Sequence, residues 1–89
     1  MKLIIAIIKD EDNDAVSNGL TQNEFRVTLI ASTGGFLRSG RSTLLIGVED
    51  DQVEAALEII RENCKKQEDD LGKKRATIFV LPVEHFTQL

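Results

Sequence analysis

Apolar and polar residues follow each other in six blocks along the chain, and the spacing within each block predicts one strand or one helix. Residues 3–8 are apolar at every position, which is typical of a central strand covered on both faces. Residues 25–32 and 42–48 follow a period of two and predict two further strands. Residues 76–81 form a fourth largely apolar run, which ends at Pro82 and predicts the last strand.

The two remaining blocks carry apolar residues at helical spacing. The first predicts a helix over about 12–22, preceded by acidic N-cap candidates. Glycine costs about 1 kcal/mol relative to alanine inside a helix, so Gly19 indicates close packing there. Asp51 and Glu54 resemble a capping box and predict that the second helix starts at Asp51 and ends near Lys65. Its expected apolar side consists of Val53, Ala56, Leu57, Ile60 and Cys64.

The period of two also assigns residues to the two faces of the sheet, because alternate side chains of a strand point to opposite sides. In the strand 25–32 one face is expected to hold Phe25, Val27, Leu29 and Ala31, and the other Arg26 and Thr28. In the strand 42–48 the inward residues are expected to be Leu44, Ile46 and Val48, with Thr43, Leu45 and Gly47 opposite. A glycine inside a strand often marks a place where another group approaches the backbone.

The order strand, helix, strand, strand, helix, strand predicts an α+β, ferredoxin-like βαββαβ fold in a single domain, residues 1–89. Both helices are then expected on one face of an antiparallel sheet. The other face has no cover within the chain, although the first and last strands are apolar on both sides. Burying that face requires another subunit, so the sequence predicts an oligomer.

Residues 33–41 connect two of the predicted strands and carry three glycines around one aromatic residue, Phe36. From residue 25 to 48 the chain has no acid and three cations, Arg26, Arg38 and Arg41, although its net charge is −4. Backbone donors, arginines and an aromatic ring suit a ligand that carries both phosphate and a flat base. Taken alone, the segment is equally consistent with a tight connection between strands.

Composition excludes several classes of function. An acidic chain with a pI of about 4.9 lacks the cations that generic DNA or RNA binding needs. One cysteine, Cys64, and one histidine, His85, offer neither an internal disulfide nor the ligand spacing of a metal site. No group of residues is arranged for acid–base or nucleophilic work, so we expect a protein that is not an enzyme and needs no cofactor. The opening apolar run is too short to cross a bilayer, and we expect a cytoplasmic protein without a membrane partner.

Five segments, taken together and in order, resemble the PII-like cyclic-di-AMP receptor family. They are Met1–Ile7, Phe25–Thr28, Thr33–Arg38, Leu44–Val48 and Phe79–Val83. The resemblance implies a homotrimer of ferredoxin-like subunits that binds cyclic di-AMP in the clefts between neighbouring subunits. It also implies a signalling role, in which ligand orders residues 33–41, and with them 65–75, for a downstream protein partner whose identity is unknown.

The same resemblance implies roles for individual residues. Phe36 stacks on an adenine, and the backbone of Gly35, Leu37 and Gly47 contacts the base and phosphate at close range. Arg26 and Thr28 meet the phosphates and the base edge. Phe79 and Gln88 complete the site, from the neighbouring subunit or the chain end.

The chain departs from the family at two positions of the implied site, where Glu24 and Arg41 stand in place of asparagine. Glu24 brings an anion towards a ligand with two phosphates, while Arg41 either contacts a phosphate or closes the site. The segment 65–75 is also much shorter than the corresponding loop of many members. Two alternatives therefore stay open: a PII-like trimeric scaffold that binds no nucleotide, and a PII-type sensor of ATP or ADP.

Overall fold

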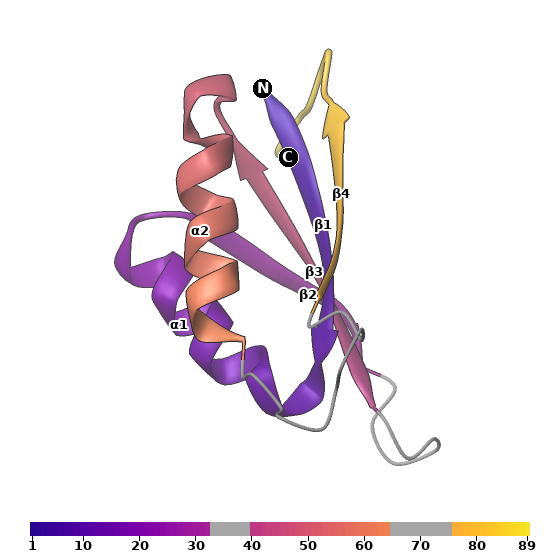
Figure 1. Ribbon diagram of the computed structural model, residues 1–89. Coiled ribbons are helices and arrows are strands. Elements are labelled where there is room, and N and C mark those ends of the chain that lie inside the picture. The colour runs from indigo at the N-terminus through magenta and orange to yellow at the C-terminus, as the bar shows by residue number, and fades with distance from the viewer. Residues whose placement is uncertain (33–39, 65–75) are drawn as a thin grey trace.

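The computed structural model describes residues 1–32, 40–64 and 76–89, and these ranges contain four strands and two α-helices (Figure 1). In chain order they are β1 Lys2–Lys9, α1 Asn13–Gln22, β2 Arg26–Ser32, β3 Arg41–Val48, α2 Val53–Asn63 and β4 Ala76–Pro82. Short 3-10 turns, η1 Asp10–Asp12 and η2 Asp50–Gln52, precede the two helices. All six predicted elements are confirmed, with bounds that differ by one or two residues.

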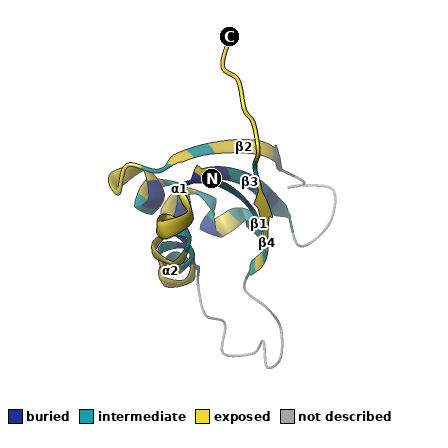
Figure 2. Ribbon diagram, turned by 90° about the horizontal axis from the view of Figure 1, so that it is seen from above, coloured by how far each residue is buried: buried dark blue, intermediate teal, exposed yellow. Residues whose placement is uncertain are grey.

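The four strands form one sheet in the order β2-β3-β1-β4, and each neighbouring pair is antiparallel. Both helices lie on one face of this sheet, as the view from above shows (Figure 2). This order, with one helix in each of the two crossover connections, is the ferredoxin-like arrangement that the sequence predicts.

The core lies between the helices and the centre of the sheet. The two central strands contribute alternate residues that are at most 2% exposed, and both helices bury apolar residues against them. The buried set is Ile4, Ala6, Ile8, Leu44, Ile46 and Val48 from the strands, and Val16, Leu20, Ala56, Ile60 and Cys64 from the helical half. Each fully buried branched side chain contributes roughly 1.5–3 kcal/mol, so this one layer supplies most of the hydrophobic stabilisation of a subunit.

Gly19 lies where the two helices cross, as its position inside the predicted helix indicates. A Cβ atom at Gly19 would stand 2.7 Å from Nδ2 of Asn63 and 3.1 Å from Cγ2 of Ile59, both on α2. These distances are below or near the limit of real contacts, so α2 approaches α1 too closely for a larger residue to enter without a shift. The prediction of close packing at Gly19 is confirmed.

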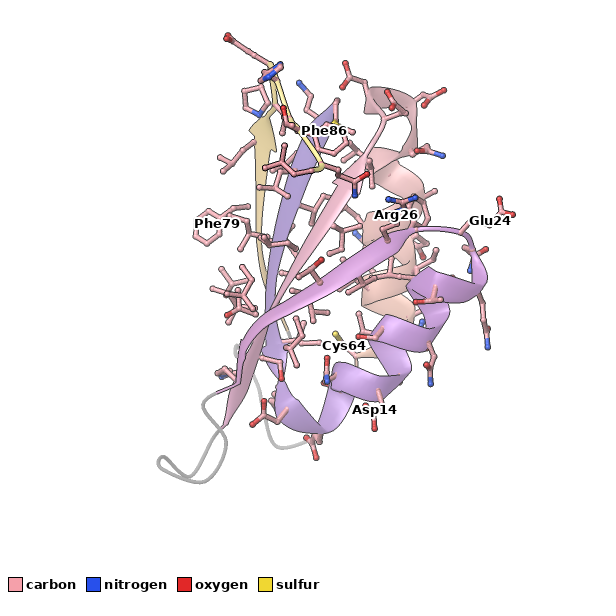
Figure 3. The ribbon with its side chains drawn as sticks, turned by 180° about the vertical axis from the view of Figure 1, so that it is seen from behind. Asp14, Glu24, Arg26, Cys64, Phe79 and Phe86 are labelled. Carbon is pink, nitrogen blue, oxygen red and sulfur yellow. The ribbon has the colours of Figure 1, made fainter. Side chains whose placement is uncertain are left out.

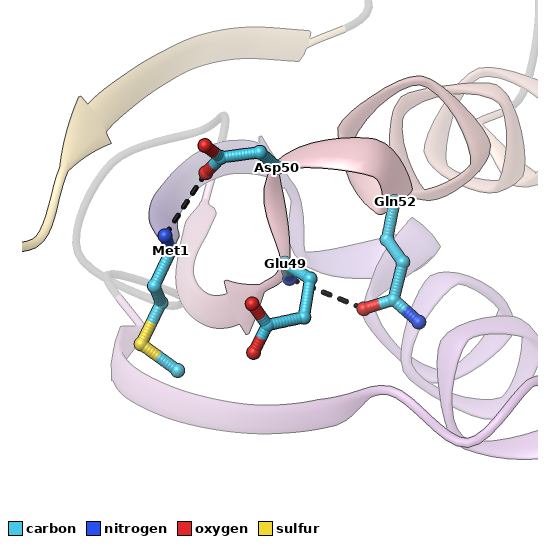
Figure 4. A network of polar contacts seen from close by, with 4 residues as sticks. All are labelled: Met1, Glu49, Asp50 and Gln52. Atoms are coloured by element: carbon cyan, nitrogen blue, oxygen red, sulfur yellow. Dashed lines mark hydrogen bonds and ion pairs between the residues drawn. The ribbon is translucent and has the colours of Figure 1, made fainter.

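One predicted helix cap is wrong, and the other makes no hydrogen bond through its side chain. The capping box before α2 consists of Glu49 and Gln52, with the Glu49 N–H donating to Oε1 of Gln52 at 3.1 Å, and not of Asp51 and Glu54 (Figure 4). The reason is the turn η2, which starts the helical path two residues before the predicted N-cap. At α1, the N-cap Asp12 makes no capping hydrogen bond through its side chain.

The predicted alternation of β2 does not hold along its whole length. A bulge interrupts the pairing with β3. Leu29 stands opposite Leu44, but the next paired residue of β2 is Ala31, which stands opposite Thr43. Leu29 faces the helices by register, yet it is 49% exposed, because it lies on an edge strand. A bulge adds one unpaired residue, so a strict period of two is lost at this point.

The second face of the sheet is uncovered by the described part of the chain, as predicted. Its central residues Leu3, Ile5 and Leu45 are half-buried by their neighbours within the sheet. Towards the β4 edge, Phe79 is 51% exposed and Leu81 43%. By register, Arg26, Thr28, Arg41, Thr43 and Gly47 lie on the same side of the sheet. This whole side, opposite the helices, is called the open face below. A broad apolar face of this kind is unfavourable in contact with water, so we still expect another subunit to cover it.

The first helix ends in a Schellman motif that turns the chain into β2. The N–H of Glu24 donates to the carbonyl of Thr21 at 3.0 Å, and the N–H of Phe25 donates to that of Leu20 at 3.0 Å. Glu24 occupies the left-handed position of the motif with φ 68°, which glycine usually fills. A side chain with a Cβ is strained in this conformation by about 1–2 kcal/mol.

Glu24→Gly is therefore expected to raise the free energy of unfolding by about 1 kcal/mol, because glycine adopts a positive φ without strain. Urea denaturation of the two proteins at one protein concentration measures the difference. Glu24→Ala is the control, since it removes the carboxylate but keeps a Cβ at the same φ. If alanine stabilises the fold as much as glycine, the charge and not the backbone conformation is responsible.

Candidate functional site

Three of the predicted site residues lie together on the open face, where β2 pairs with β3. Arg26 stands directly opposite Gly47, and Thr28 stands opposite Leu45 two positions further along. Directly opposite residues of an antiparallel pair are about 5 Å apart at their Cα atoms. Arg26 and Thr28 are both exposed, as is Gly47. A guanidinium, a hydroxyl and bare backbone thus share one small area of the sheet.

Gly47 leaves this area open without serving the packing of the subunit. A Cβ atom placed on Gly47 would meet no other atom within 4 Å. The residue also needs no unusual backbone conformation, since it continues β3 in register with Leu3 of β1. A glycine that neither packing nor conformation requires is typical of a place where a molecule from outside approaches the backbone.

Phe79 lies on the same face but at the opposite edge of the sheet (Figure 3). The register runs from Thr28 through Leu45 and Ile5 to Phe79, which puts Phe79 at the level of Thr28 but three strands away. Three strand spacings amount to about 14 Å. The ring is half exposed, and the open face presents it to solvent in this subunit.

Arg41 lies at the other end of the same face. It pairs with Lys9 at the start of β3, whereas Gly47 stands close to its end. Six residues of extended chain span about 20 Å, so Arg41 is remote from Gly47 within one subunit.

The remaining predicted site residues are Gly35, Phe36, Leu37 and Gln88. The first three lie outside the described residues. Gln88 belongs to the exposed tail 84–89, which follows a hydrogen bond from the Val83 N–H to the Met1 carbonyl at 3.0 Å. The tail projects away from the sheet (Figure 2).

The predicted site residues that the structure describes therefore fall into separate groups on one subunit. Arg26, Thr28 and Gly47 form one group, while Phe79 and Arg41 lie at two other margins of the open face. The structure does not bring these groups around one common space. A ligand that contacts all of them must be long, or a second subunit must supply some of them.

Sequence reasoning missed one interaction beside Arg41. The Ser42 hydroxyl donates to Oδ1 of Asp10 at 2.5 Å, and Ser42 is only 1% exposed. A signal for it was present, because Ser42 is a polar residue at a position that shares the inward face with Leu44 and Ile46. Its partner lies 32 positions away and was not evident from local spacing.

The chain beyond Gly47 is tied to the amino terminus. The Met1 ammonium lies 2.9 Å from Oδ1 of Asp50 (Figure 4). The hydrogen bond from this ammonium and its positive charge lower the pKa of Asp50 below 3.8 against an opposing effect of desolvation, and the charge of Lys2 lowers it further. Asp50 is exposed, so the pair is open to screening by salt.

The described residues offer few other candidates for chemistry. They contain no group of three acidic, histidine or cysteine side chains that could hold a metal ion. Cys64 is buried in the core at the end of α2, and His85 lies in the exposed tail, 3.2 Å from the Thr87 hydroxyl. None of the helices described is long and apolar enough to span a membrane.

The family of this chain follows from a comparison with known protein families. A family model described as "Cyclic-di-AMP receptor" matches residues 1–75, which include both helices and the Arg26–Gly47 pair. The chain belongs to the cyclic-di-AMP receptor family. This PII-like family is the one that the sequence segments resemble, and it supports cyclic di-AMP as the ligand. The match does not test the role of any individual site residue, so these roles stay predictions, and Phe79 and Gln88 lie beyond the matched span.

A solved structure supports the same architecture. A functionally unknown protein from Pediococcus pentosaceus ATCC 25745 is 35% identical to this receptor-family chain, with a TM-score of 0.78. The similarity covers 99% of this chain and 96% of the other. The two proteins therefore share the same overall fold.

The first prediction about the site concerns Gly47→Ala. We expect the free energy of unfolding to stay unchanged or rise by up to about 1 kcal/mol, because glycine weakens a strand relative to alanine. We expect the affinity for cyclic di-AMP to fall about tenfold or more, because a methyl group forced into a close contact costs about 1–3 kcal/mol. Urea denaturation and calorimetric titration measure the two quantities.

The matched control is Gly19→Ala, the same change on the helical side of the sheet. Its methyl group forces Asn63 to shift within the helical layer and leaves Gly47 untouched, so the free energy of unfolding should fall while the affinity of the folded protein should not change. An affinity that Gly47→Ala leaves intact would mean that no ligand approaches this part of β3.

The second prediction concerns the pH dependence of Asp50. A carboxyl group whose pKa is lowered on folding stabilises the fold above its unfolded pKa, and this contribution is lost as the pH falls through the folded value. An NMR titration should therefore show a midpoint below 3.8 for Asp50. The midpoint should return towards 3.8 in about 1 M salt, because the pair is exposed. A midpoint at or above 3.8 in dilute buffer would contradict the ion pair with Met1.

Proposed function

We propose that this protein is a cytosolic sensor that binds cyclic di-AMP at the contacts between subunits of a homotrimer. Occupancy is relayed to a downstream protein through the ordering of residues 33–41, together with 65–75. The protein carries out no reaction of its own, and it uses neither a metal nor a cofactor. Membership of the receptor family supports the ligand, and the arrangement of the open face supports the place of binding.

The observation that carries the proposal is the Arg26–Gly47 pair on the open face. Arginine binds phosphate through two parallel N–H donors, and the bare strand backbone beside it accepts a flat group at van der Waals distance. Thr28 adds a hydroxyl that both donates and accepts. These three residues match the needs of one half of a cyclic dinucleotide, a phosphate joined to a nucleoside.

The spread of the other predicted residues supports binding between subunits. In one subunit Phe79 is about 14 Å from Thr28, and Arg41 is about 20 Å from Gly47. Copies of the chain that turn their open faces towards one another around a three-fold axis would bring different margins of the sheet together. The apolar residues of the open face give such an association its driving force.

In this proposal the residues divide the ligand between them. Phe36 stacks on one adenine, and Gly35, Leu37 and Gly47 offer backbone to the base and phosphate. Arg26, Thr28 and Arg41 contact phosphates and a base edge. Phe79 and Gln88 close the site from a neighbouring subunit, which agrees with the position of Phe79 at the margin of the sheet and of Gln88 in a tail that leaves it.

Glu24 favours the alternative of a trimeric scaffold that binds no nucleotide. It lies two positions from Arg26, is exposed, and brings an anion to the edge of the proposed site. Cyclic di-AMP carries two phosphate charges, which this carboxylate repels. A PII-type sensor of ATP or ADP is the weaker alternative, since the fold alone supports it.

Isothermal titration calorimetry of the full chain with cyclic di-AMP tests the proposal. Separate titrations with cyclic di-GMP and with ATP serve as controls. We expect saturable binding of cyclic di-AMP alone, close to one molecule per subunit. Phe36→Ala should weaken this binding by about 1–3 kcal/mol, because it removes a stacked base.

Three other outcomes would contradict the proposal in different ways. No heat with any of the three nucleotides, from a folded oligomer, would favour the scaffold. Binding of ATP alone would favour the PII-type sensor. Binding of cyclic di-AMP that Phe36→Ala leaves unchanged would keep the ligand but remove the stacking role.

A further inference from the structure

Asp10 contacts the start of β3 at two points. It is the first residue after β1, and its N–H donates to the carbonyl of Gly40 at 3.1 Å. Its side-chain Oδ1 accepts the hydroxyl proton of Ser42 at 2.5 Å. Arg41 lies between the two residues that Asp10 holds, so both contacts flank it directly.

The contact with Ser42 is of a strong type. An O–H that donates to a carboxylate forms a shorter and stronger hydrogen bond than two neutral partners do. Ser42 is 1% exposed, so water competes little for its hydroxyl group. Asp10 is half-buried and belongs to η1, which leads into α1. The start of β3 is thereby joined to the helical layer as well as to β1.

These contacts fix the backbone from which the Arg41 side chain starts. Ser42 alternates with Leu44 and Ile46 and belongs to the covered side of the sheet, which puts Arg41 on the open face with Thr43 and Leu45. A rotation of the strand about its own axis would turn Arg41 away from that face. The Asp10–Ser42 hydrogen bond opposes this rotation from the buried side.

We infer that Asp10 is a positioning residue for the cyclic dinucleotide site, which holds Arg41 on the open face through Ser42 and Gly40. The inference rests on the proposed function, because Arg41 needs a phosphate to contact. It also explains how an arginine serves at a position where the family resemblance implies the shorter asparagine. A long side chain gains a defined direction only when its backbone is fixed.

A purely structural role for Asp10 predicts a different behaviour. If Asp10 only links β1, β3 and η1, its replacement would lower the free energy of unfolding. Any effect on ligand binding would then be the same with and without Arg41. As a positioning residue, it affects binding only while Arg41 is present. The side chain of Asp10 does not cap α1, whose N-cap residue is Asp12.

The experiment is a mutant cycle in the full chain, with affinity for cyclic di-AMP measured by calorimetry. Ser42→Ala and Asp10→Ala are each expected to weaken binding about fivefold, and the double variant no more than either alone, because they break the same contact. In an Arg41→Ala background, Ser42→Ala should weaken binding less than about twofold. Asp10→Asn keeps an acceptor oxygen for Ser42 and should bind more tightly than Asp10→Ala.

Asp14→Ala is the matched control, since Asp14 is an exposed acid in the first turn of α1 with the same charge as Asp10 (Figure 3). It should bind as the unchanged protein does. Hydrogen exchange of the backbone amides checks that each variant is folded. If the alanine variants do not fold, Asp10→Asn, which preserves the size and shape of the side chain, replaces Asp10→Ala in the cycle.

The possible failures are distinguishable. If the unchanged protein does not bind cyclic di-AMP, the proposed function is wrong and this inference falls with it. If the unchanged protein binds but Arg41→Ala binds equally well, Arg41 contacts no phosphate and only the positioning role is wrong. An equal loss on Ser42→Ala with and without Arg41 would show that Asp10 and Ser42 serve stability alone.

Discussion

Two helices bury one face of a four-stranded sheet, and the alternation of each strand then dictates what the other face must be. The residues that place Ile4 and Ile46 in the core place Leu3 and Leu45 on the open face, because successive side chains point to opposite sides. Within residues 1–32, 40–64 and 76–89, no element covers that face. The open face therefore faces solvent, a ligand or another copy of the chain, and the proposed site lies on it.

The pair of Arg26 and Gly47 shows how this constraint leads to a site. Both residues lie on the open face, at positions where a sheet face that is buried in an oligomer would normally carry apolar side chains. A charged group and an absent side chain contribute nothing to the packing of the subunit, and the extra Cβ at Gly47 would meet nothing. The packing of the subunit therefore requires neither residue, and both are available to the ligand that we propose for this member of the cyclic-di-AMP receptor family.

Much of this architecture was predictable from sequence, because strand and helix periods depend on neighbouring residues. Leu44, Ile46 and Val48 face inward as the alternation predicts, and Gly19 marks the helix crossing. The errors arise where a local rule gives way. The bulge after Leu29 adds an unpaired residue, and the turn η2 moves the capping box to Glu49.

The candidate site was only partly predictable. Arg26 and Thr28 were assigned to one face from the alternation, but their roles came from family resemblance. Asp10 and Ser42 were missed, because their hydrogen bond joins residues far apart in sequence and only the register of β1 with β3 brings them together. The unusual φ of Glu24 was equally hidden, since nothing in an ordinary glutamate predicts a left-handed backbone.

In the proposed function, one subunit holds only part of the ligand site. Native mass spectrometry of the full chain with cyclic di-AMP, over a range of protein concentrations, tests this directly. We expect ligand on the trimer, with as many as one molecule for each subunit, and none on the monomers released by dilution. A monomer that retains cyclic di-AMP would contradict it, because the site would then be complete within a single chain.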